Sequence, residues 1–141
     1  MAMDNIFGIA GSALNAQLTR MNATASNLAN AGNVATEEKD AFRAKRLVFQ
    51  TLVEQQKAQH LEPLQGGVRV ANIVSDPTPV QKQYEPGNPL ADKDGFVYHS
   101  NVNEVTEMVE MMAAARSYQN NVEMVNTTRQ LMLRTLEITR S

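Results

Sequence analysis

The sequence predicts a mainly helical α+β chain, in which long N- and C-terminal helices pack as a coiled-coil-like pair and a small β-rich region lies between them. Three observations lead to this prediction. Both ends lack proline, both carry apolar residues at helical intervals, and the turn-forming residues gather in the middle. We therefore expect an N-terminal helix over residues 1–32, a small extended and loop region over 33–100, and a C-terminal helix over 101–141.

The N-terminal helix is predicted by apolar residues at a strict interval of seven. Gly8 and Gly11 each cost a helix about 1 kcal/mol relative to alanine, so we expect a firm start only near Ser12. Asn30 and Gly32 tolerate the backbone of a helix C-cap and predict its end. Two columns of side chains form the predicted seam: Phe7, Leu14, Met21 and Leu28 in the first, and Leu18 and Ala25 in the second.

The middle region reads as short extended segments separated by turns. We expect extended chain over 41–52, a strand over 68–73, where β-branched residues follow two glycines, and a brief extended piece over 96–98. Proline and glycine exclude a helix between the last two segments and predict a loop. The residues that characterise this loop are Tyr84, Pro86, Gly87, Asn88, Pro89, Asp92 and Gly95.

The C-terminal helix is the clearest element. Asn101 followed by Glu104 is a capping-box pattern, and neither glycine nor proline occurs from Val102 onward. Apolar residues then recur at steps of three and four, with Arg129 as the polar interruption. This stripe consists of Met108, Met111, Ala115, Tyr118, Val122, Val125, Met132 and Leu136.

The two helices are too long for the core that this chain can form. A helix of about 35 residues is about 50 Å long, while only 5% of the residues are aromatic and none is tryptophan. Ordering the backbone costs about 1–2 kcal/mol per residue, and a buried leucine or methionine returns about 1.5–3 kcal/mol. We expect the ends to pack on each other and to be completed by neighbouring subunits, as assembly helices.

Two alternatives remain open at this point. Each stripe is also compatible with an amphipathic helix that lies on its own domain. The five methionines of the C-terminal helix fit ordinary core filling as well as a surface that adapts to several partners.

Composition excludes several classes of function. A net charge of −2 and a pI near 5.7 argue against a nucleic-acid partner, and the absence of cysteine excludes disulfides and thiolate metal sites. The N-terminus has neither the basic start nor the apolar run of a signal peptide, so any export would use a route without a cleaved leader. Without a run of about 18 apolar residues, we expect no membrane insertion.

No catalytic, metal or cofactor site is predicted. The acidic stretch at 92–95 resembles the start of a calcium loop, but Leu90 and Asn101 would occupy positions that require carboxylates, so we interpret it as a plain turn. His60 and His99 are isolated from other potential ligands. No serine has the surroundings of a nucleophile elbow.

Several segments resemble flagellar rod and hook proteins. The runs Asn-Ile-Phe-Gly-Ile-Ala-Gly-Ser-Ala-Leu at 5–14 and Ala-Ser-Asn-Leu-Ala-Asn-Ala at 25–31 are similar to the N-terminal signature of that family. Residues 42–49, the loop over 84–97, and 116–127 are similar to a subunit of the proximal rod. The chain departs from the pattern at 34–39 and at 53–62, both expected to be surface connections.

The resemblance implies a structural subunit of the periplasm-spanning rod of the flagellar basal body. Such a subunit would leave the cell through the flagellar type III export apparatus, stack helically around a channel and transmit torque. Its terminal helices would supply the packing and its middle region would face outward. The implied partners are other copies, the remaining proximal and distal rod subunits, the rod-to-ring adaptor, the MS ring and the export apparatus. The second hypothesis is a helical adaptor or needle-like component of another type III secretion assembly, and an enzyme is the third.

Overall fold

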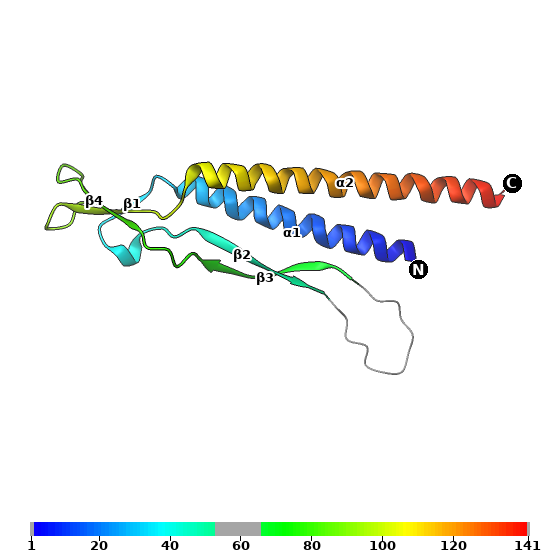
Figure 1. Cartoon of the computed structure of the whole chain (residues 1–141), viewed down its shortest axis with the longest axis horizontal. Helices are drawn as coiled ribbons and strands as arrows, with labels where there is room; N and C mark the ends of the chain where they lie inside the picture. Colours follow the sequence, from blue (N-terminus) through cyan, green and yellow to red (C-terminus); the bar gives the residue numbers. More distant parts are fainter. Residues whose placement is uncertain (1, 53–65, 141) are drawn as a thin grey trace, which may run out of the picture.

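The computed structural model describes residues 2–52 and 66–140, and Figure 1 shows two long helices beside a thin β region. This confirms the predicted mainly helical α+β class. The surface connection predicted at 53–62, where the chain departs from the family pattern, lies outside the described residues, and so does His60. In chain order the elements are α1 (Ala2–Asn30), β1 (Val34–Ala35), the 3₁₀ turn η1 (Glu38–Asp40), β2 (Lys45–Thr51), β3 (Val68–Ser75), β4 (Gln81–Tyr84), β5 (Phe96–His99) and α2 (Glu104–Arg140).

Helix α1 is continuous through both of its early glycines. The expectation of a firm start near Ser12 is therefore wrong, because α1 packs against α2 and against strands β2 and β3, and this packing offsets the glycine cost. Its end is as predicted. The Asn30 side chain donates a hydrogen bond to the Ser26 carbonyl at 2.7 Å, and the chain turns immediately afterwards.

Helix α2 runs for 37 residues, close to the predicted length, but a different asparagine caps it. The Asn103 Oδ1 atom accepts the Thr106 N–H at 3.0 Å, and the first backbone bond of the helix joins Glu107 N to Asn103 O. The predicted capping box of Asn101 and Glu104 is wrong because the Asn101 side chain bonds to other segments.

The β region consists of two separate antiparallel sheets. Strands β2 and β3 form a hairpin in which Leu47 pairs with Ile73, and an irregularity follows Val48. Strands β1, β5 and β4 form a three-stranded sheet in that order, with β4 and β5 joined by the predicted loop. The extended segments predicted within 41–52, 68–73 and 96–98 are confirmed. The sequence did not reveal β1 and β4, which are two and four residues long, and β4 is exposed throughout.

Three layers run along the long axis of the molecule (Figure 1). Helix α1 lies between α2 on one side and the β2–β3 hairpin on the other. The two chain ends lie at the same end of the molecule, so the helices are antiparallel, and α2 extends beyond the start of α1. The three-stranded sheet lies at the opposite end. Neither helix, within the described residues, has a stretch long and apolar enough to cross a bilayer.

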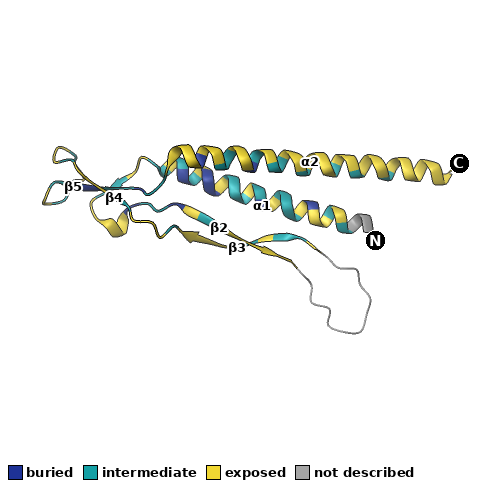
Figure 2. Cartoon of the chain, in the orientation of Figure 1, coloured by how far each residue is buried: buried dark blue, intermediate teal, exposed yellow. Residues whose placement is uncertain are grey.

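The core is thin and is built almost entirely from alanine. Among the described residues, the buried apolar side chains are those of Ala10, Ala16, Ala23, Ala41, Ala44, Val97 and Ala114. Figure 2 shows that α2 is exposed over most of its surface. The chain has an accessible surface of 10326 Å², whereas a compact protein of its mass exposes about 7,300 Å².

Candidate assembly interface

One face of α2 packs towards α1 with a regular alternation of three and four residues. Glu107 and Ala114 are buried, and Asn121 and Thr128 continue the same column at intervals of seven. The neighbouring column contains predicted stripe residues, all half-buried: Met111, Tyr118, Val125 and Met132, with Ala115 beside them. The predicted spacing of three and four residues is therefore present. In this part of α2, the residues that follow it pack within the subunit.

The remaining residues of the predicted α2 stripe are exposed. Met108 and Val122 lie beside the inward columns and are not covered. Leu136 is 56% exposed although the helical period places it below Met132 on the inward side. It is uncovered because α1 is eight residues shorter than α2, so the last turns of α2 have no helix opposite them.

The predicted seam of α1 divides in the same way. Phe7, Leu14, Met21 and Leu28 are half-buried, whereas Leu18 and Ala25 are exposed. The fourteen residues predicted on α1 and α2 thus fall into two groups. One group is partly buried within the subunit, and the other is exposed to solvent. Whether they contact other subunits remains a prediction.

Sequence reasoning missed several of the most exposed apolar residues of α2. Val105 and Met112 are 71% and 69% exposed, and Met124, Leu131 and Ile138 recur at intervals of seven on another side of the helix. The interval of seven could have revealed these residues in the sequence. The predicted stripe of α2 has similar spacing, and from the sequence we interpret it as the apolar face of the helix. The exposed apolar residues of α2 outside the predicted stripe are Val105, Val109, Met112, Met124, Leu131, Leu133 and Ile138.

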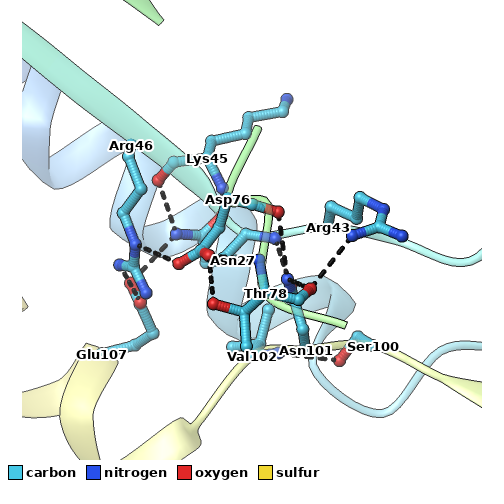
Figure 3. A network of polar contacts seen from close by, with 11 residues as sticks. Asn27, Arg43, Lys45, Arg46, Asp76, Thr78, Ser100, Asn101, Val102 and Glu107 are labelled. Carbon is cyan, nitrogen blue, oxygen red and sulfur yellow. Dashed lines mark hydrogen bonds and ion pairs between the residues drawn. The ribbon is translucent and has the colours of Figure 1, made fainter. Parts of the chain in front are cut away.

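A polar joint, formed by Asn27, Arg46, Asp76, Asn101 and Glu107, holds the layers together (Figure 3). Asn27 is 1% exposed and lies on α1. Its Oδ1 atom accepts the Lys45 N–H at 2.7 Å, and its Nδ2 group donates to the Lys45 carbonyl and to Glu107 Oε2, each at 3.0 Å. One amide side chain thereby links α1, β2 and α2, with both of its N–H donors and its oxygen engaged by these two partners.

Glu107 and Arg46 are the charged centre of the polar joint. The Glu107 carboxylate is fully buried and accepts a hydrogen bond from Arg46 Nη1, while Arg46 Nε donates to Asp76 Oδ2 at 3.1 Å. Hydrogen bonds from the Thr78 hydroxyl and backbone N–H, followed by the bond from Arg46, lower the pKa of Asp76. The buried carboxylate is tolerated because both of its oxygens have donors.

Asn101 closes the polar joint at the start of α2. Its Oδ1 atom accepts the Ala44 N–H at 2.7 Å, and its Nδ2 group donates to the carbonyls of Asp76 and Thr78 at 3.2 and 2.8 Å. This side chain therefore joins the segment before β2, the segment after β3 and the segment before α2. Hydrogen bonds of the polar joint therefore connect the helices to the β region.

The predicted loop over 84–95 is held by bonds within itself. Asp92 Oδ1 accepts the N–H groups of Asp94 and Phe96 at 2.9 and 2.8 Å, and Asn88 Nδ2 donates to Glu85 Oε2 at 2.9 Å. Hydrogen bonds from Asn88 and then from His99 lower the pKa of Glu85. Gly95 has a φ of 82°, and a Cβ there would lie 2.8 Å from Tyr84. Tyr84, Pro86, Gly87 and Pro89 keep an outward, exposed surface.

The members of the polar joint were not predicted as site residues. Glu107 could have been suspected, because it precedes buried Ala114 by seven positions and so places a charge in a helix column that faces inward. Asn27 carries no such signal, since isolated asparagines occur throughout α1. Within the described ranges, no group of three or more His, Cys, Asp or Glu side chains is placed to hold a metal ion.

Comparison with known proteins identifies the family. Residues 7–34 match the family described as "Flagella basal body rod protein", and residues 93–138 match "Flagellar basal body rod FlgEFG protein C-terminal". Over 138 residues, which cover 98% of each chain, the sequence is 51% identical to the flagellar basal-body rod protein FlgC of Yersinia enterocolitica and 49% identical to that of Salmonella typhimurium. It is 41% identical over 140 residues to FlgC of Buchnera aphidicola from Acyrthosiphon pisum, again covering 98% of each chain.

The matched stretches extend over nearly the whole chain, so they span most of α1 and α2 and the loop between β4 and β5. The two matched families cover most of α1 and α2. The names of these relatives are those of rod proteins of the flagellar basal body. The chain therefore belongs to the FlgC family of flagellar basal-body rod proteins.

Proposed function

We propose that this structural subunit of the flagellar basal-body rod assembles helically through the open faces of α1 and α2, transmits torque along the rod and lines the export channel. The proposed assembly helices correspond to residues 1–32 and 101–141, with 33–100 as the region between them. The proposed contacts include the exposed members of the predicted stripe and the exposed apolar residues of α2 that the sequence did not reveal.

The observation that carries this proposal is the uncovered apolar surface of α2. Val105, Met108, Val109 and Met112 are each more than half exposed within the first three turns. Exposed apolar residues scattered singly are normal on a monomer, but a row of them on one helix marks an interaction site. The overhanging turns beyond Met132 add a second uncovered apolar region with Leu133 and Leu136.

The shape of the subunit supports an open assembly. The apolar rows of α2 and the largely uncharged open face of α1 are different surfaces, so a contact between them would be head to tail. A head-to-tail contact whose rotation does not close generates a helical filament. Helix α2 is about 55 Å long, and helices of this length stacked side by side, in the manner of a coiled coil, would carry torsion along the rod.

The proposed partners follow from family membership. They are other copies of this chain, the other proximal and distal rod subunits, the rod-to-ring adaptor, the MS ring and the export apparatus. Export without a cleaved signal peptide belongs to the same proposal. The relatives bear the names of rod proteins, and none of the observations favours an adaptor or needle-like component of another secretion assembly.

Thiol labelling tests the proposal. The chain contains no cysteine, so Met112→Cys introduces a single thiol at the exposed face of α2. We expect a maleimide to label this thiol rapidly in the isolated chain and at least tenfold more slowly in purified basal bodies, because a neighbouring subunit would cover it. Mass spectrometry of the labelled subunit gives both rates.

Dissociation of the same basal bodies in denaturant is the control and should restore full labelling. Met124→Cys, on another side of α2, provides an independent position if Met112→Cys lowers the number of basal bodies. Equal labelling rates for both thiols in the free and assembled subunit would contradict the proposal.

A further inference from the structure

Helix α1 has three faces with three different surroundings. At 100° per residue, Ser12, Ala16, Ala23 and Asn27 lie within about 60° of one another, on the side where α1 contacts the β2–β3 hairpin. Ala10 and Thr24 are buried further round the helix, towards α2. The third face is open, and its exposed residues follow steps of three and four: Gly8, Gly11, Asn15, Leu18, Asn22, Ala25 and Ala29.

Between its two ends, this face of α1 meets the hairpin with small side chains, whereas Ile9 lies near Gly66 at one end of the face. Ala16 and Ala23 are 3% and 7% exposed and present only methyl groups to the strands. Such a surface is smooth, and it discriminates weakly between one position of a strand and the next. The register of the hairpin along α1 must therefore be set by other groups.

Asn27 is the first of these groups. Its amide pairs with both the N–H and the C=O of Lys45, as the backbone of an adjacent strand would. The first residue of β2 is thereby tied to one position on α1. A shift of the strand by one residue would leave the buried amide of Asn27 without these partners, at a cost comparable to lost hydrogen bonds.

Ser12 is the second group. The Val68 N–H donates to Ser12 Oγ at 3.1 Å, and the same hydroxyl donates to the Ile9 carbonyl at 2.7 Å. The neighbouring Gly67 approaches so closely that a Cβ there would lie 2.9 Å from Ser12 Oγ. The first residue of β3 is thereby tied to a second position on α1.

The two attachment points match in spacing. Ser12 and Asn27 are 15 residues apart, which is about 22 Å along a helix. Val68 pairs with Thr51, and Lys45 lies six residues before Thr51, which is about 20 Å along a strand. The helix and the hairpin therefore meet at both points only in one register.

We propose that Ser12 and Asn27 are positioning residues that hold the β2–β3 hairpin in this register, so that it seals one face of α1 and leaves the open face for neighbouring subunits. This inference rests on the proposed function, since the open face has a role only if the subunit assembles. The sealed face would otherwise compete as an alternative uncharged contact surface. The hairpin thus determines which side of α1 a neighbouring subunit meets.

Amide hydrogen exchange of the full-length chain tests the attachment itself. We expect Ser12→Ala to accelerate exchange at Val68 about fivefold, the factor for one neutral hydrogen bond, and Asn27→Ala to accelerate exchange at Lys45 at least tenfold. Amides in the middle of α1 and α2 should keep their rates. Thr19→Ala is the matched control, because within the part of the chain that the structure describes its hydroxyl bonds only to the Asn15 carbonyl of the same helix.

The double variant Ser12→Ala with Asn27→Ala tests the consequence. We expect it to enter fewer than a tenth as many basal bodies as Thr19→Ala. Unchanged hairpin exchange in both single variants would overturn the proposal, and so would normal assembly of a double variant whose hairpin exchanges rapidly. If Asn27→Ala unfolds the chain, Ser12→Ala decides alone through Val68. The hairpin attachment and the assembly of the subunit are tested separately. Hydrogen exchange in the isolated chain does not depend on assembly, and the labelling of Met112→Cys does not depend on Ser12 or Asn27.

Discussion

Replacing Glu107 by alanine is expected to lower the free energy of unfolding of the isolated chain by about 2–3 kcal/mol. The substitution removes the acceptor of two hydrogen bonds and leaves the Asn27 amide with an unpaired buried donor. Removing one partner of a fully buried ion pair costs about 3–5 kcal/mol. The side chain of Arg46 is 40% exposed, so water can solvate part of its charge and the expected loss is smaller.

Urea unfolding followed by far-ultraviolet circular dichroism measures this loss. Glu110→Ala is the matched control, because Glu110 lies one turn further along α2 and also pairs with an arginine, Arg20. Both of those side chains are partly exposed, so breaking their ion pair should cost less than about 1 kcal/mol. Similar losses for the two alanine variants would show that the polar joint does not stabilise the subunit.

Met112→Asp is expected to abolish incorporation into basal bodies while leaving the stability of the isolated chain within about 0.5 kcal/mol of wild type. Met112 is exposed in the subunit, and a carboxylate at that position remains solvated as long as the chain is alone. Assembly through this face would bury the carboxylate against apolar groups without a partner, which carries a large desolvation cost. The variant therefore separates folding from assembly.

Immunoblots of purified basal bodies and swimming in soft agar measure the second outcome, with the variant as the sole copy in the cell. Met112→Leu keeps the apolar character and similar volume of the side chain, and should incorporate and swim as wild type does. Normal incorporation of Met112→Asp would exclude this face of α2 from the rod contacts.

The two helices were predictable because each contains many residues of consistent periodicity. The 29 residues of α1 and 37 of α2 repeat the same apolar spacing several times, so the signal survives two glycines in α1. The strands within 41–52 and 68–73 were recognisable from β-branched residues and flanking turns. Strands β1 and β4 have too few residues to repeat any pattern.

The periodicity did not predict which residues of the apolar stripes are buried within the subunit and which are exposed. A seven-residue interval places side chains on one face, but it does not indicate whether that face meets the same chain or another one. Leu136 illustrates this, because it shares the period of Met132 and is exposed only because α1 is shorter. The difference in helix length becomes visible only when the two helices are aligned in space.

The polar joint was beyond prediction for a different reason. Its members come from α1, β2, the segments that flank the sheets and α2, and their polar groups pair only after the chain has folded. In sequence, Asn27 resembles the other asparagines of α1, and the interval of seven from Glu107 to Ala114 does not reveal which groups pair with the carboxylate. The alanine core explains why such a joint is needed, since methyl groups alone do not specify how three thin layers are aligned.

The subunit is expected to bury the open faces of its helices only when neighbours are present. Amide hydrogen exchange of residues 133–140, compared between the isolated chain and purified basal bodies, tests this expectation most directly. These turns of α2 have no helix opposite them in the subunit, so we expect rapid exchange in isolation and protection of at least a hundredfold in the rod. Equal exchange in the two states, whether both fast or both slow, would contradict it.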